Sequence, residues 1–162
     1  MKEILAIDPG STESAWCLID YDTRKPLHFN KEPNEAVRKF LTQTSADTLA
    51  VEMVASYGMP VGAEVFETCV WIGRFIEASD DNPWIFRRDR CFRQPVKLHH
   101  CHDSRAKDSN IRQALVNRFA AGQPNHGKGT QAEPGWFYGF RADIWQAYAL
   151  AVYVADQQES KP

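Results

Sequence analysis

Residues 2–12 read K-E-I-L-A-I-D-P-G-S-T, a short apolar run that ends at Asp8 and meets Pro-Gly at once. Such a run is typical of a buried strand that is closed by a tight turn. Residues 14–20 (S-A-W-C-L-I-D) predict a second strand, and residues 26–30 predict a third. The short connections between the three strands favour an antiparallel meander.

A helical period follows these three predicted strands. Pro33 stands where a helix can begin, and an amphipathic pattern runs from there to Leu41. Residues 48–52 (T-L-A-V-E) then predict a fourth strand, which ends in Glu52. A strand–helix–strand crossover of this kind places the fourth strand parallel to its neighbour in the sheet.

The second half of the chain predicts three helices and one more strand. The clearest helical stripe has apolar residues at 61, 65, 69, 72 and 76. In chain order, the other predicted segments are a fifth strand at 84–88, an irregular stretch at 89–105, a helix at 106–120, a Gly/Pro-rich loop at 121–135 and a helix at 142–157. The length of the loop indicates a mobile segment. We therefore expect one α/β domain, residues 1–162, with a mixed five-stranded sheet flanked by helices.

The positive charge of the chain is concentrated in one segment. The net charge is −2, but residues 1–86 carry −7 and residues 87–118 carry +6, from nine basic and three acidic residues. Trp84, Phe86 and Phe92 lie in or beside this segment. A cationic patch with aromatic side chains can bind phosphates and stack on exposed bases, although a solvated basic face would have the same composition.

The sequence predicts neither secretion nor a membrane span. No apolar stretch approaches the roughly 20 residues of a membrane helix, and the N-terminal residues lack a secretory signal. We expect a cytoplasmic protein without a membrane partner, in which the four scattered cysteines are free thiols. The run His99-His100-Cys101-His102 could belong to a zinc site, but no second pair of ligands accompanies it. Histidines that face solvent or phosphate are the preferred interpretation.

Three acidic residues stand at the ends of predicted elements. Asp8 ends the first strand, Glu52 ends the fourth, and Asp143 begins the last helix. Taken singly, each could be a simple turn former. If the two strands are adjacent and parallel, however, their carboxylates emerge at the same edge of the sheet. Carboxylates within ~4 Å repel by roughly 4 kcal/mol per pair at an effective dielectric near 20, so such a cluster needs a cation or a proton. Oxygen ligands of this kind predict a Mg²⁺ site that also accepts Mn²⁺ and activates water for phosphodiester hydrolysis.

Four stretches of the chain resemble sequence blocks of the RuvC-type Holliday-junction resolvases. I-L-A-I-D-P-G-S-T-E-S-A-W-C-L-I-D resembles their first hairpin, and L-A-V-E-M-V-A-S-Y resembles the block in which a glutamate ends the fourth strand. S-R-A-K-D-S-N-I-R-Q-A-L and R-A-D-I-W-Q-A-Y-A-L-A-V-Y resemble two later blocks. The first two blocks are specific, and phage-encoded members are the most similar in length and motif sequence. The resemblance implies an RNase H-like fold, with three antiparallel strands followed by parallel strands.

The resemblance also implies roles for particular residues. The family has a four-carboxylate metal site, to which Asp8, Glu52 and Asp143 correspond, while Gln146 stands where the second acid of the final block would be. Either Asp143 alone completes the site, or Gln146 assists it at the metal. Lys107 matches the family's basic residue near the scissile phosphate, although a solvated lysine at a helix start is an equal alternative.

The remaining candidate residues concern DNA and the partner subunit. Arg105 and Arg112 are candidate contacts to the DNA backbone, and Tyr57 could stack on an unpaired base near a junction. The family is typically homodimeric and pairs through its long helix, and the wide apolar surface of residues 61–76 is compatible with a homodimer.

We therefore predict a metal-dependent endodeoxyribonuclease that cleaves branched DNA such as Holliday junctions, in a bacterial or phage-infected cell. Flaps, replication forks and RNA–DNA hybrids are alternative substrates. Gln146 leaves open a non-catalytic DNA-binding relative of the same fold. The D-P-G-S-T run also resembles the phosphate loop of sugar-kinase and actin-like ATPases, but those proteins need two lobes, and 162 residues provide one.

Overall fold

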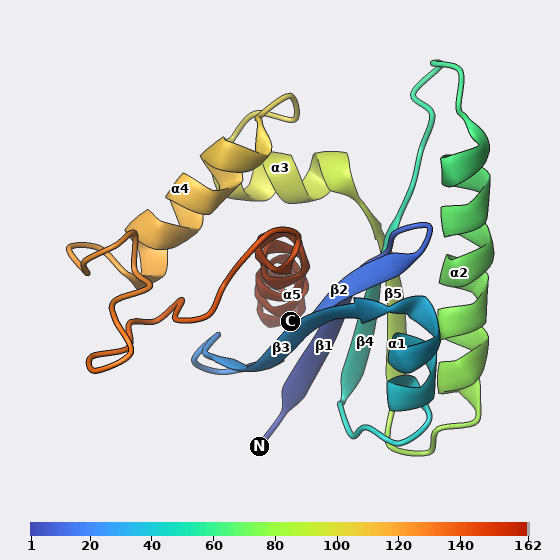
Figure 1. The fold of residues 1–162 in the computed structure, drawn as a ribbon, viewed down its shortest axis with the longest axis horizontal. Coiled ribbons are helices and arrows are strands. Elements are labelled where there is room, and N and C mark those ends of the chain that lie inside the picture. Colours follow the sequence, from blue (N-terminus) through green and yellow to red (C-terminus); the bar gives the residue numbers. More distant parts are fainter. Residues whose placement is uncertain (162) are drawn as a thin grey trace.

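A computed structural model describes residues 1–161 of the chain. It contains one five-stranded sheet in the order β3-β2-β1-β4-β5, with helices on both faces (Figure 1). The strands are β1 (Glu3–Asp8), β2 (Glu13–Asp20), β3 (Pro26–Pro33), β4 (Thr48–Met53) and β5 (Arg87–Phe92). The helices are α1 (Asn34–Leu41), α2 (Ala63–Asp80), α3 (Arg93–Cys101), α4 (Asp108–Phe119) and α5 (Ile144–Glu159).

The strand directions confirm the predicted fold class. β2 pairs antiparallel with both β1 and β3, whereas β4 pairs parallel with both β1 and β5. The sheet is therefore mixed, with an antiparallel meander at one side and two parallel neighbours at the other. This is the arrangement of an RNase H-like fold.

Each face of the sheet packs on its own helices. Ile4 and Ala6 of β1 lie in a core cluster with α5, while Leu5 and Ile7 lie in a second cluster with α1 and α2. In Figure 1, α5 accordingly covers one face of the sheet, and α1 and α2 cover the other. Since strand side chains alternate between the two faces, Asp8 continues the Ile4–Ala6 row and faces the α5 side.

Two predictions for residues 84–105 were wrong. The fifth strand covers Arg87–Phe92 rather than 84–88, and the stretch predicted to be irregular contains α3. β5 (R-R-D-R-C-F) is an edge strand, where charged side chains are tolerated and an apolar alternation is not required. α3 carries Pro95 in its first turn, where a missing backbone N–H costs no hydrogen bond, and Val96 is its one buried residue. With a single buried residue among nine, α3 has no recurring apolar stripe by which the sequence could show it.

The long predicted helix is confirmed as α2, but its buried side differs from the predicted stripe. The residues that α2 buries against the rest of the chain are Thr68, Ile72, Phe75, Ala78 and Ser79. Phe66 and Val70 are 62% and 55% exposed instead. α2 thus carries apolar side chains on two sides, of which residues 1–161 cover only one.

Residues 121–135 form a loop with internal backbone hydrogen bonds. The amide of Gly129 donates to the carbonyl of Pro124, and the amide of Gly135 donates to that of Lys128. Gly129 has a positive φ of 65°, and a Cβ there would lie 2.3 Å from the carbonyl oxygen of Glu133. Glycine is therefore required for this turn. The mobility of the loop stays a prediction.

In residues 1–161, no helix combines the length and apolarity that a bilayer crossing requires.

The cysteines form no disulfide in residues 1–161, and two of the histidines contact other side chains or the backbone of the protein. All four cysteines are free thiols, as predicted, and Cys17 is buried. The expectation that the histidines face solvent or phosphate was wrong for two of them. His100 is half-buried, and its Nε2 lies 2.8 Å from the Ala149 carbonyl oxygen. Partial burial lowers the pKa of His100 to about 4. His99 pairs instead with Asp156 of α5.

Asp156 is the centre of an ion-pair network that joins four segments of the chain. Its carboxylate lies 3.0 Å from Arg24 Nη2, 2.6 Å from Arg118 Nη1 and 2.8 Å from His99 Nε2. Burial alone would raise the pKa of Asp156, but hydrogen bonds from these three side chains hold it well below its usual range. The Arg24 side chain is only 6% exposed. The network therefore balances a buried positive charge beneath the C-terminal part of α5.

Replacing Asp156 by Asn should lower the free energy of unfolding at pH 7 by about 2 kcal/mol, because Arg24 loses its main buried partner. A depressed carboxyl pKa adds stability above pH ~4, and this contribution is lost as the pH falls towards the folded-state pKa. The difference between the variant and the unaltered protein should therefore shrink from pH 7 to pH 3 in urea denaturation. Asp81→Asn, at an exposed position beyond α2, is the control. An equal loss at both pH values would contradict the prediction.

Candidate functional site

The sheet register brings Asp8 and Glu52 side by side. β1 and β4 are parallel, and their paired residues include Ile7 with Val51. The next residue of each strand is a carboxylate, so Asp8 and Glu52 emerge at the same edge and on the same face of the sheet. Both side chains are nearly buried, with exposures of 10% for Asp8 and 11% for Glu52. The sequence prediction that these two residues converge is confirmed.

The turn after Asp8 is held by a small polar clamp. The Gly10 amide donates to Ser14 Oγ, Ser14 Oγ donates to Asn34 Oδ1, and Asn34 Nδ2 donates to the Gly10 carbonyl. A Cβ at Gly10 would lie 2.3 Å from the carbonyl oxygen of Glu13. The D-P-G-S-T run therefore fixes the direction in which β1 delivers Asp8, and only glycine allows the close approach.

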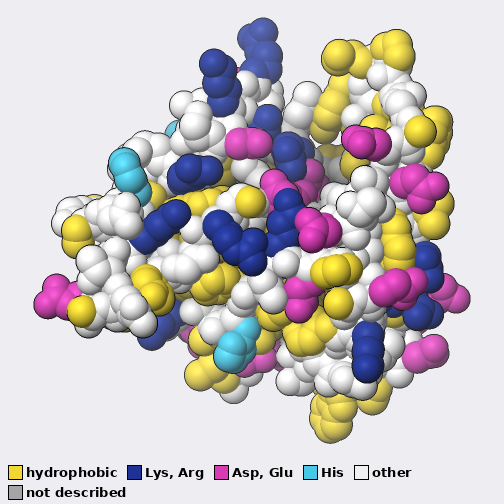
Figure 2. Space-filling model, in the orientation of Figure 1, with side chains coloured by type: hydrophobic (Ala, Val, Ile, Leu, Met, Phe, Trp, Pro, Cys, Tyr) yellow, Lys and Arg dark blue, Asp and Glu magenta, His cyan; other side chains and the backbone are white. Residues whose placement is uncertain are grey.

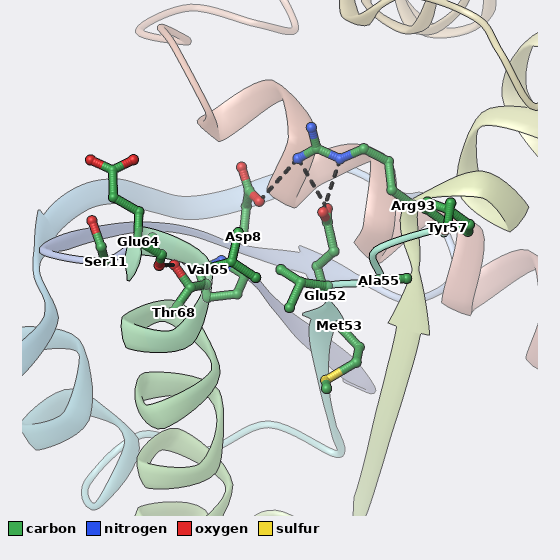
Figure 3. A pocket seen from close by; sticks show the side chains of 13 residues that line it. Asp8, Ser11, Glu52, Met53, Ala55, Tyr57, Glu64, Val65, Thr68 and Arg93 are labelled. Carbon is green, nitrogen blue, oxygen red and sulfur yellow. Dashed lines mark hydrogen bonds and ion pairs between the residues drawn. The ribbon is translucent and has the colours of Figure 1, made fainter. Parts of the chain in front are cut away.

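Arg93 bridges the two carboxylates (Figure 3). β4 and β5 are paired up to Met53 and Phe92, and Arg93 follows directly as the first residue of α3. Its Nε lies 2.9 Å from Glu52 Oε1, and its Nη2 lies 3.3 Å from both Asp8 Oδ1 and Glu52 Oε2. Three neighbouring strand ends thus supply one cation and two anions to a single site.

The electrostatics of this site favour a cation. Burial raises the pKa of Asp8 well above its usual range, and the neighbouring charge of Glu52 raises it further, while Arg93 opposes the shift. Burial also raises the pKa of Glu52, against the lowering effect of Arg93. Two nearly buried carboxylates are therefore costly to ionise together, and a positive charge between them lowers that cost.

A cleft of about 480 Å³ opens beside the carboxylates. Asp8, Glu52 and Arg93 line one part of it, and Tyr57 and Glu64 line another, from the β4–α2 loop and the start of α2. Tyr57 has a positive φ of 47° and is 54% exposed. The cleft lies at the edge of the sheet where the strands deliver their charged side chains, and its mouth includes an exposed aromatic ring.

Asp143 lies near the site, but its carboxylate points to another partner. It precedes α5, is 51% exposed, and its Oδ2 accepts a hydrogen bond from Lys31 Nζ at 2.7 Å. It is close enough for its charge to contribute to the raised pKa of Asp8. Gln146, one turn further along α5, is buried. In the described part of the chain, no three His, Cys, Asp or Glu side chains form a ready metal cluster.

The other predicted residues lie at exposed positions on α4 and on the connection from α3 to α4. Lys107 is the N-cap of α4, and the residue after it, Asp108, has its Oδ2 3.8 Å from Arg93 Nη1. Arg105 lies in the α3–α4 connection. Arg112 is exposed on α4, and its guanidinium stacks 5.3 Å from the ring centre of Trp145. These positions are compatible with the predicted roles, which stay predictions.

Much of the basic segment 87–118 is engaged within the protein. Its ion pairs within the protein include Arg87 with Asp89, Arg88 with Asp80, Arg93 with Glu52, and Arg118 with Asp156. On the face shown in Figure 2, basic side chains gather over the side of α3 and α4, next to acidic side chains near the centre. The sequence was therefore right about where positive charge is concentrated, but part of that charge neutralises the protein's own carboxylates.

Three contributors to the site were missed from the sequence: Arg93, Asp108 and Lys31. Arg93 was hidden because residues 89–105 were predicted to be irregular, so nothing placed it at a strand end. A correct end for β5 would have placed Arg93 at the same edge of the sheet as Asp8 and Glu52, because these two residues lie at the ends of the neighbouring strands. Lys31 lies beyond the predicted end of the third strand, which extends to Pro33.

Neither protein-family models nor curated protein sequences give a match to this chain. Among solved structures, RuvC of Thermus thermophilus superposes with a TM-score of 0.69 at 14% identity, over 97% of this chain and 96% of RuvC. The chain has the RuvC fold. T. thermophilus RuvC in complex with a Holliday junction substrate superposes with a TM-score of 0.66 at 13% identity, over 99% of this chain and 98% of that one. The RuvC-type resemblance found in the sequence is thus confirmed for the fold, over nearly the whole chain.

Replacing Asp8 by Asn should stabilise the protein in EDTA at pH 7–8, by about 1 kcal/mol. A carboxyl group whose pKa is raised by folding costs stability above its unfolded-state pKa of about 4, and this cost disappears as the pH falls. The gain should therefore shrink towards pH 4 when denaturation is measured across that range. Asp81→Asn is again the matched control. A destabilised Asp8→Asn variant at pH 8 would show that Arg93 already compensates the Asp8 charge fully.

Proposed function

We propose that this protein is a metal-dependent endonuclease that cleaves branched DNA, such as Holliday junctions, by phosphodiester hydrolysis. One observation carries the proposal: Asp8 and Glu52 lie together at neighbouring strand ends in a cleft, on a fold shared with RuvC. The RuvC structure in complex with a Holliday junction substrate supports the substrate class. A cytoplasmic location and a relation to phage-encoded members stay predictions.

The donor set of the cleft fits Mg²⁺ or Mn²⁺. Asp8 and Glu52 offer carboxylate oxygens that already share one cation in this structure, the Arg93 guanidinium. Hard divalent ions prefer such oxygens. Asp143, released from Lys31, would be the third ligand, with Gln146 as a possible amide oxygen donor beside it. When bound, the ion would supply Lewis-acid stabilisation of the phosphate charge and lower the pKa of a water molecule.

The surrounding side chains would hold the DNA. Lys107, at the exposed start of α4, would neutralise charge at the scissile phosphate, and Arg105 and Arg112 would contact the backbone on either side. Tyr57, exposed at the mouth of the cleft, presents a ring on which an unpaired base could stack. Such stacking favours substrates with splayed bases at a branch point.

Cleavage of a synthetic four-way junction in Mg²⁺ tests the proposal. The unaltered protein should nick the junction, and Asp8→Asn or Glu52→Gln should lower the rate by at least about 100-fold, because either change removes an anionic oxygen ligand. Asp81→Asn should cleave normally. Junction, flap, fork and RNA–DNA hybrid substrates compared in one assay would define the preferred branch. Undiminished cleavage by Asp8→Asn would overturn the assignment of the site.

A non-catalytic DNA-binding function is the second candidate. It is favoured by Gln146 in place of an acid and by the pairing of Asp143 with Lys31. Under this alternative the unaltered protein would bind junctions in Mg²⁺ without nicking them, and Asp8→Asn would bind equally well. The cleavage assay therefore separates the two candidates.

We also propose that the protein acts as a homodimer that pairs through α2. Phe66 and Val70 form an exposed apolar pair on this helix, and Val61 and Met59 before it are exposed as well. One cleft per subunit would suit two cuts on opposite strands of a symmetric junction, because a two-fold dimer repeats each site.

Replacing Phe66 by Glu should shift the protein from dimer to monomer in analytical ultracentrifugation, with at least a tenfold weaker self-association constant. The reason is that a charge in an apolar contact would be left without a partner. Phe86→Glu changes a similarly exposed aromatic residue, which lies directly before β5, and should leave the dimer intact. A monomeric unaltered protein, or a dimer that is disrupted only by Phe86→Glu, would contradict pairing through α2.

A further inference from the structure

We infer that Arg93 is a resident counter-ion of the site, and that a divalent ion binds between Asp8 and Glu52 only when the Arg93 guanidinium leaves them. The inference rests on the proposed function for the presence of the divalent ion. The position of Arg93 is observed in the structure itself (Figure 3).

The geometry makes the two cations compete for the same oxygens. Arg93 donates to Glu52 Oε1 at 2.9 Å, and its Nη2 lies 3.3 Å from an oxygen of each carboxylate. Mg²⁺ needs its oxygen ligands at about 2.0–2.1 Å and in near-octahedral directions. A guanidinium hydrogen-bonded to both carboxylates blocks those directions, and its positive charge repels a second cation.

The Arg93 guanidinium has an alternative acidic partner near the site. Its side chain is 34% exposed, and it belongs to the first turn of α3 at the edge of the cleft. On the side away from Glu52, its Nη1 lies 3.8 Å from Oδ2 of Asp108, a half-exposed carboxylate that opens α4. A small rotation of the Arg93 side chain would therefore move its guanidinium from the two buried carboxylates to Asp108, so that its charge would keep an acidic partner.

A second cation on the other side of the site has the same relation to its acid. Lys31 Nζ donates to Asp143 Oδ2 at 2.7 Å. Each of the three acidic residues predicted to bind the metal is thus paired with a basic side chain of the chain itself. Such partners keep the acids from repelling one another before a divalent ion arrives, and they lower its apparent affinity by the fraction of molecules in which they remain bound.

Titration with Mn²⁺ in the absence of DNA, followed by electron paramagnetic resonance of the free ion, tests the inference. Arg93→Gln should bind Mn²⁺ about tenfold more tightly than the unaltered protein, since the competing cation is gone. Arg90→Gln, an exposed arginine of β5, is the matched control and should bind with unchanged affinity. Equal or weaker binding by Arg93→Gln would overturn the inference and would make Arg93 a support for the metal ligands.

Thermal melting provides a second readout that does not depend on activity. In EDTA, Arg93→Gln should have a lower melting temperature than the unaltered protein, because Asp8 and Glu52 then repel without a cation between them. On addition of Mn²⁺, the melting temperature of the variant should rise more than that of the unaltered protein. Arg93→Lys keeps the charge but not the bidentate contact, so it should fall between the two. A Mn²⁺-induced shift that is equal in all three proteins would contradict competition.

Asp108 separates release of Arg93 from simple charge effects. Asp108→Asn should weaken Mn²⁺ binding in the unaltered background, where it removes the second partner of Arg93, but should have little effect when Arg93 is already Gln. The same loss in both backgrounds would contradict the exchange. Failure of Mn²⁺ to bind any variant would overturn the metal-dependent function together with this inference. If Arg93→Gln binds Mn²⁺ more tightly but the unaltered protein does not cleave the junction, the inference is supported and the nuclease function is rejected.

Discussion

Two carboxylates buried side by side at the ends of β1 and β4 are the constraint on which the rest of this structure depends. Asp8 and Glu52 are placed by a parallel register that no side-chain rotation can change. Burial raises the pKa of both groups, so folding costs free energy at neutral pH unless a cation is present. The chain meets this demand with Arg93, the first residue beyond the adjacent strand β5. The site is therefore a charge arrangement set by the sheet before any ligand binds.

The parts of the fold that are buried on both sides were predictable from the sequence. β1, β2 and β4 are short apolar runs with turn residues at their ends, and their order, with a helix before the fourth strand, implies a parallel pair. On the condition that the first and fourth strands form this pair, Asp8 lies next to Glu52, and the structure shows that they do. Gly10, whose Cβ would collide with the Glu13 carbonyl, explains why Pro-Gly follows the aspartate. Local sequence and global topology agree in this half of the chain, and so the prediction held.

The edge of the sheet was not predictable in the same way. β5 has four charged residues among its six, because an edge strand with one open side needs little apolar surface. Because the predicted bounds of β5 were wrong, α3 was not located, and Arg93 could not be distinguished from the other basic residues of its segment. The charge of that segment was read as a surface for DNA, whereas Arg88, Arg93 and Arg118 pair with acids of the same chain. Composition locates charge along a sequence, but only the fold shows which charges are already paired.

The same electrostatics explain why an amide at position 146 suits this chain. Asp8, Glu52 and Asp143 carry three negative charges around the site, and Arg93 and Lys31 carry two positive charges against them. Gln146 is buried on α5, one turn after Asp143. A carboxylate there would add a fourth negative charge in a buried position and would need a further cation to offset its desolvation. A neutral amide at this buried position avoids most of that cost. With Arg93 and Lys31 as the only basic side chains paired with the three acids Asp8, Glu52 and Asp143 in the described residues, the identity of residue 146 is a matter of charge rather than of fold.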